Sequence, residues 1–111
     1  MKNSLDNGTL RRENQRHQGT GGVSQGNAAL GFRPAFFDYA RHVIYPSRFR
    51  DGRQAPFHLL EGLPEEAVAI RSPDGRVVAA KATLIAGFER NGYFYTRAAA
   101  AKAVKEWARV A

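Results

Sequence analysis

The chain has 111 residues, a net charge of +7, 43% hydrophobic residues and no cysteine. This length suits one small domain, and the lack of thiols excludes disulfides, cysteine nucleophiles and thiolate metal sites. No apolar run approaches the roughly 20 residues that cross a bilayer, so we expect no membrane association. The polar start predicts no secretory signal peptide, and because small secreted domains usually need disulfides, we expect a cytoplasmic location.

Residues 1–30 differ from the rest of the chain in composition. They are rich in Asn, Gln and Gly and contain no aromatic residue. Such a segment buries too little apolar surface to offset the entropy of ordering it, and residues 19–22 (Gly-Thr-Gly-Gly) are typical of a flexible linker. The sequence therefore predicts a disordered tail over 1–30 and a single small α+β domain over 31–111.

Two β-hairpins are predicted around Asp74-Gly75 and Asn91-Gly92. An Asx-Gly pair favours a type I′ turn, in which both central residues have positive φ. Each pair lies between runs rich in β-branched, aromatic or small apolar residues. These runs are 67–71 and 76–80 for the first pair, and 84–88 and 93–96 for the second.

A third hairpin is predicted from residues 36–38 and 43–45, and Pro46 would close its second strand or lie at a sheet edge. Residues 76–88 read either as one long strand or as two. Thirteen residues exceed the usual strand length, so we expect a bulge or break near Lys81.

Two irregular segments follow the third hairpin. Residues 47–60 surround an Asp-Gly turn and read as a loop or a weak hairpin. Residues 64–66 (Pro-Glu-Glu) resemble a first helical turn, since proline is tolerated there and carboxylates favour the positive end of the helix dipole. This helix is expected to be short, because β-like sequence begins at Val68.

The C-terminal segment gives the strongest helix prediction. Thr96 is suited to cap it, and an alanine-rich run without Gly or Pro continues to the last residue. Trp107 is the expected anchor of an apolar face that also includes Ala100, Val104 and Ala111. Hairpins followed by one helix indicate an α+β fold, with a mostly antiparallel sheet of four to six strands packed by the C-terminal helix.

Catalytic, cofactor and metal sites are not predicted. The three histidines lack metal-ligand spacing, no serine lies in a nucleophile motif, and the glycine-rich segment lacks the strand and helix of a phosphate-binding loop. An enzymatic function would become the better hypothesis if the fold brought Asp38, His42 and His58 into one cleft.

A binding function is the remaining hypothesis, centred on an arginine-rich region over residues 41–53. Arginine and aromatic side chains are enriched at protein interfaces, so we expect a non-enzymatic protein-interaction domain that uses the 45–58 loop. The alternative is a nucleic-acid-binding protein that uses the same cations for phosphates and an aromatic ring for base stacking. Neither the identity of the partner nor an oligomeric state follows from the sequence. The candidate binding residues are Arg41, His42, Arg48, Phe49, Arg50 and Arg53.

Overall fold

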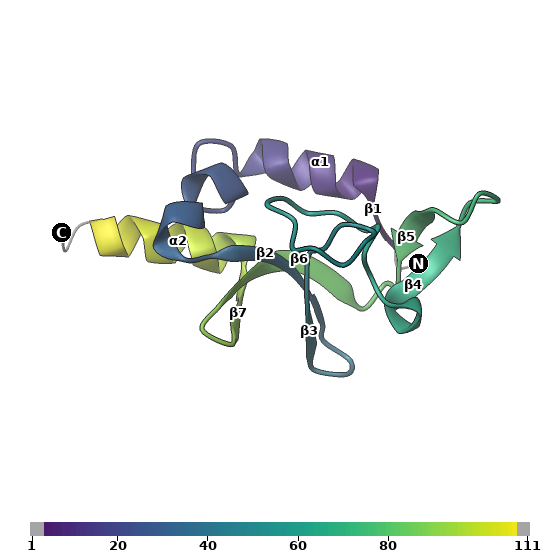
Figure 1. Cartoon of the computed structure of the whole chain (residues 1–111). Helices are drawn as coiled ribbons and strands as arrows, with labels where there is room; N and C mark the ends of the chain where they lie inside the picture. Colours follow the sequence, from purple (N-terminus) through teal and green to yellow (C-terminus); the bar gives the residue numbers. More distant parts are fainter. Residues whose placement is uncertain (1–3, 109–111) are drawn as a thin grey trace.

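Two antiparallel sheets and two α-helices form the α+β fold of residues 4–108, the part of the chain that this computed structural model describes (Figure 1). The strands are β1 (Leu5–Asp6), β2 (Arg33–Asp38), β3 (Val43–Pro46), β4 (Val68–Arg71), β5 (Val77–Ala80), β6 (Leu84–Arg90) and β7 (Tyr93–Thr96). The helices are α1 (Asn7–Arg16) and α2 (Arg97–Ala108), with short 3₁₀ turns η1 (Ser24–Gly26), η2 (Ala28–Leu30) and η3 (Glu65–Ala67). Over residues 4–108, no helix combines the length and apolarity needed to cross a membrane.

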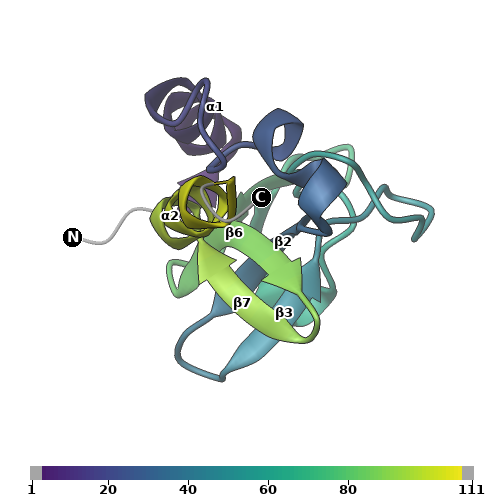
Figure 2. The same cartoon turned by 90° about the vertical axis from the view of Figure 1, so that its left-hand side faces the viewer.

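The larger sheet has the strand order β3-β2-β6-β7, and the smaller one has the order β1-β5-β4. Phe36 of β2 lies opposite Tyr45 of β3 and Ala86 of β6. Their buried side chains form the main core with Leu10 of α1 and Leu60. Both α-helices lie on the same side of the larger sheet (Figure 2). The main core lies between the larger sheet and a layer formed by α1 and the chain between β3 and β4.

The three predicted hairpins are confirmed as β2–β3, β4–β5 and β6–β7. Asn91 and Gly92 both have positive φ, 54° and 86°, as a type I′ turn requires. At the other pair only Gly75 does, with φ 89°, so the expectation for Asp74 is wrong. The reason is local, because the Asp74 carboxylate accepts a hydrogen bond from the Arg76 N–H at 3.2 Å and Gly75 closes a four-residue turn back to Ser72.

The break predicted near Lys81 is also confirmed. β5 ends at Ala80 in the smaller sheet, and β6 begins at Leu84 in the larger one. The Lys81 N–H donates to the Ala67 carbonyl, and the Leu84 N–H donates to the Lys81 carbonyl, each within about 3 Å. These bonds stabilise the crossing between the two sheets, and Pro46 lies at the end of edge strand β3 as expected.

The 47–60 segment combines the two structures considered from the sequence. A bridge joins Arg48 to Gln54, and the Phe49 N–H donates to the Arg53 carbonyl at 2.8 Å, which closes a short hairpin around Gly52. The rest is loop. The predicted helical turn after Pro64 is present as η3.

The C-terminal helix begins at Arg97, directly after its predicted cap. The Thr96 hydroxyl accepts a hydrogen bond from the Ala99 N–H at 3.0 Å. Ala100 is fully buried, and the Trp107 ring stacks on Phe32 with 5.5 Å between ring centroids. The fold class and this helix are therefore confirmed, although the strands divide into two sheets. The expected contribution of Ala111 lies outside the described residues.

The disorder predicted for residues 1–30 is wrong for the described part of that segment. Asp6 caps α1 by accepting a hydrogen bond from the Thr9 N–H at 2.8 Å. Leu5, Leu10 and Val23 are buried. The prediction from average composition failed because three well-spaced apolar side chains are enough to dock this segment on the complementary apolar surface of the rest of the domain.

Candidate functional site

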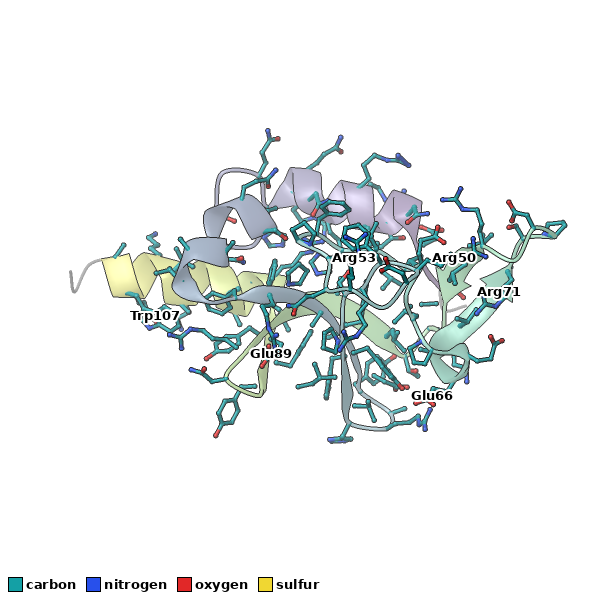
Figure 3. All side chains as sticks on the ribbon, viewed as in Figure 1. Arg50, Arg53, Glu66, Arg71, Glu89 and Trp107 are labelled. Carbon is teal, nitrogen blue, oxygen red and sulfur yellow. The ribbon has the colours of Figure 1, made fainter. Side chains whose placement is uncertain are left out.

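The candidate binding residues occupy two separate turns. Arg41 and His42 lie between β2 and β3, where the Arg41 guanidinium is 3.6 Å from the Glu66 carboxylate. Figure 3 shows Glu66 well separated from Arg50 and Arg53, which come from the 47–60 loop. The structure therefore does not bring the six residues into one basic surface.

The 48–54 turn is held together by its own arginines. The Arg53 Nε donates to the Asp51 carboxylate at 2.7 Å, and hydrogen bonds from the Arg53 main chain and side chain lower the pKa of Asp51. The Arg53 guanidinium also lies over the Phe49 ring, 4.9 Å from its centroid. Arg48 donates to the Gly52 carbonyl at 3.0 Å. Arg50 is exposed and makes no ion pair within residues 4–108.

An open pocket of about 950 Å³ lies beside this segment. One wall comes from residues 14–28, which are the end of α1 and the loop after it, and the other from residues 56–58. Phe57 remains 49% exposed at the pocket, and its ring contacts Phe49 edge to face at 6.1 Å. Sequence reasoning missed this pocket because it assigned the first wall to a disordered tail.

His58 lines this pocket as a neutral side chain. Burial, together with the positive charge of Arg97, lowers the pKa of His58 to about 4. Because Arg97 only donates, Nδ1 accepts its hydrogen bond at 3.2 Å and the ring proton resides on Nε2, which donates to the Gly87 carbonyl at 2.7 Å. Both ring nitrogens are therefore engaged, and this geometry suits a structural role rather than proton transfer.

Arg97 connects the pocket wall to the rest of the domain. Its side chain is 4% exposed and its Nε lies 3.1 Å from the Glu13 carboxylate of α1. It also donates to the Gly22 carbonyl at 3.0 Å. Burial lowers the pKa of Arg97, and Glu13 opposes this effect. A buried guanidinium with these partners fixes α1 and the following loop relative to α2 and His58.

The structure does not assemble Asp38, His42 and His58 into a cleft. The buried Asp38 carboxylate accepts hydrogen bonds from the N–H groups of Ala40 and Arg41 at 3.0 and 3.3 Å, which stabilises the β2–β3 turn. His42 is exposed on that same turn, whereas His58 lines the pocket. Residues 4–108 contain no group of three His, Asp or Glu side chains arranged to hold a metal ion.

Comparison of the chain with protein-family models, curated proteins and solved structures gives no match. The candidate site therefore rests on its own geometry. Its two parts are the 48–58 segment, with an exposed arginine and an exposed aromatic ring, and the adjoining pocket.

Proposed function

We propose that this chain is a non-enzymatic protein-interaction domain that binds its partner through the 48–58 segment. The observation that carries the proposal is the 49% exposure of Phe57, in a segment that also contains the exposed Arg50. A few residues carry most of the binding energy at protein interfaces, and aromatic and arginine side chains are enriched there. Loops that a rigid scaffold positions often carry function.

The 48–58 segment is well suited to recognition because its backbone is held in place. The buried Ser47 hydroxyl donates to the Phe57 carbonyl at 2.8 Å and accepts from the Leu59 N–H at 2.8 Å. The Ala55 side chain is buried beneath the segment. A surface ordered before binding loses less conformational entropy when the partner docks.

Nucleic-acid binding is the second candidate, favoured by three exposed arginines of α1. Arg11, Arg12 and Arg16 make no ion pair within residues 4–108, so they are available to phosphates. Against it, Arg41 and Arg53 pair with carboxylates. These ion pairs reduce the positive charge of the region on which the nucleic-acid hypothesis depends, so protein binding is the stronger proposal.

The proposal is tested by photo-crosslinking in cells of the source organism. A benzoylphenylalanine residue replaces Arg50 in one variant and the exposed Lys102 of α2 in the control. A crosslinked protein of defined mass is expected from position 50 and not from position 102. Equal crosslinking from both positions, or none from position 50, contradicts a protein interface on this segment.

The nucleic-acid alternative is tested separately with mixed-sequence single- and double-stranded oligonucleotides, followed by backbone NMR shifts at low and moderate salt. Phosphate contacts weaken steeply as salt rises, because counterions are released on binding. Salt-sensitive shifts on α1 and near Arg50 would favour nucleic acid over protein. An Arg50→Glu variant should abolish those shifts near the turn, whereas Lys102→Glu should not.

A further inference from the structure

Among residues 4–108, the pocket between residues 14–28 and 56–58 is lined without a single charged side chain. Charged residues make up 24% of the chain, so a lining drawn at random would include about three among its thirteen residues. His58 is neutral as well, because its pKa is lowered to about 4. The described lining therefore offers a charged occupant no partner of opposite sign, which favours an uncharged occupant.

The polar part of the lining consists of carboxamides and hydroxyls. Each carboxamide presents a donor and an acceptor side by side, the same pair that a peptide group presents. A polypeptide main chain is therefore the occupant whose hydrogen-bonding groups these side chains match. The residues are Asn14, Gln15, Gln18, Ser24 and Gln25, whereas the Thr20 hydroxyl is already bonded to the His17 carbonyl and the Gly22 N–H.

The apolar part of the lining gathers around Phe57. Val23, Ala28 and Pro56 line the same pocket, so one large apolar side chain of an occupant would find an aromatic ring and aliphatic carbon to pack against. The same carboxamides can also bind saccharide hydroxyl groups, so the choice of a polypeptide rests on the proposed protein-binding function. An anionic ligand fits less well, because the lining offers no cation.

We propose that this pocket binds a short, uncharged polypeptide segment that places one large apolar side chain against Phe57. This inference rests on the proposed function, since it names the part of the partner that the domain recognises. The Arg97–Glu13 ion pair holds α1 on one side of the pocket. The pocket therefore exists before the segment arrives, and binding does not require α1 to move.

The test begins with phage-displayed random dodecapeptides selected on the full chain, followed by calorimetry with the enriched peptides synthesised with blocked ends. Ala28 is exposed and lines the pocket, so Ala28→Trp should fill it. The matched control is Ala99→Trp, at an exposed position on α2. We expect enriched sequences with a shared uncharged stretch and one large apolar residue. Their affinity should fall at least tenfold in Ala28→Trp and stay within twofold in the control.

Specificity gives a second readout. Gln18→Glu introduces a negative charge into the lining, so selection on this variant should enrich Lys or Arg next to the apolar residue. Three outcomes overturn the inference. They are that no peptide is enriched, that charged stretches are enriched on the unmodified chain, or that peptides bind Ala28→Trp and the unmodified chain with equal affinity. Binding of an uncharged glycan array instead of peptides overturns it in favour of a saccharide site.

Failure of this inference is distinguishable from failure of the proposed function. If Ala28→Trp leaves the protein crosslink from position 50 unchanged and no peptide is selected, the domain binds a protein without using the pocket. If peptides bind the pocket while position 50 gives no crosslink, the pocket inference stands and the 48–58 surface is wrong.

Discussion

Arg97 and Glu13 are 84 residues apart in sequence, yet the Arg97 Nε lies 3.1 Å from the Glu13 carboxylate. Arg97 begins α2 and Glu13 lies near the end of α1. The pair therefore holds the N-terminal segment against the domain at the point where the pocket forms. Because the Arg97 side chain is 4% exposed, loss of its carboxylate partner leaves a buried positive charge without a countercharge.

Glu13→Ala should lower the free energy of unfolding by about 2–3 kcal/mol, somewhat below the usual cost of breaking a buried ion pair, because Glu13 is partly exposed. Urea denaturation measures the change. Arg97→Met should also destabilise, but the double variant should be more stable than the sum of the two single losses predicts, by at least ~1 kcal/mol. Additive losses would show that the two charges do not interact in solution.

Gly8→Ala tests whether α1 is folded. Gly8 lies in the first turn of α1, and an added Cβ there would make only an ordinary contact with the Asp6 carboxylate, at 3.4 Å. Because alanine is the better helix former, the substitution should stabilise the domain by about 0.5 kcal/mol. Gly19 has φ 79°, so Gly19→Ala should instead destabilise by about 1 kcal/mol. If neither variant changes the urea midpoint, residues 7–19 do not fold as described.

His58 should make stability depend on pH between about 6.5 and 4. Its pKa falls from 6.5 to about 4 on folding, so the unfolded chain binds the proton more tightly. The stability that neutral His58 contributes is complete above pH 6.5 and decreases as pH falls toward 4, by up to about 3 kcal/mol. Denaturation at pH 7.5 and 5.5 measures the onset of the loss, and His58→Gln should flatten it. A loss of the same size in His58→Gln would assign it to other groups.

Trp107→Ala should destabilise by about 2–3 kcal/mol, less than the 3–5 kcal/mol typical of a fully buried aromatic residue. The ring is only partly buried, but it stacks on Phe32. The Arg90 guanidinium lies over it, with its Cζ 4.6 Å from the centroid of the Trp107 ring. Tyr93 is 72% exposed, so Tyr93→Ala should change stability by at most about 0.5 kcal/mol. Thermal denaturation of both variants is the measurement, and similar shifts would mean that Trp107 does not anchor α2.

The hairpins and the C-terminal helix were predictable because their determinants are local. Asn91-Gly92 adopts positive φ at both residues within a few residues of the strands it joins. Thr96 caps the alanine-rich helix that directly follows it. Such signals depend on neighbours in sequence, so they are present before any tertiary contact is known.

The candidate binding site was only half predictable. The sequence placed an arginine and aromatic segment between β3 and β4, and the structure places Phe49, Arg50 and Arg53 there. The sequence could not show that Arg41, which was grouped with these residues, lies instead beside Glu66. The carboxylate partner of Arg41 lies 25 residues away in sequence, so only the folded chain reveals that pairing.

The sequence by itself therefore determined the class of fold, the positions of the hairpins and the position of the last helix. Only the tertiary structure decided that residues 4–30 pack on the domain, that Arg97 is buried and that residues 14–28 face Phe57 across a pocket. The physical reason is that turns and caps are set by short-range backbone geometry, whereas the folding of a polar segment depends on a surface that distant residues supply. Leu10 is a core residue only because Phe36, Leu60 and Ala86, all distant from it in sequence, pack with it in one buried cluster.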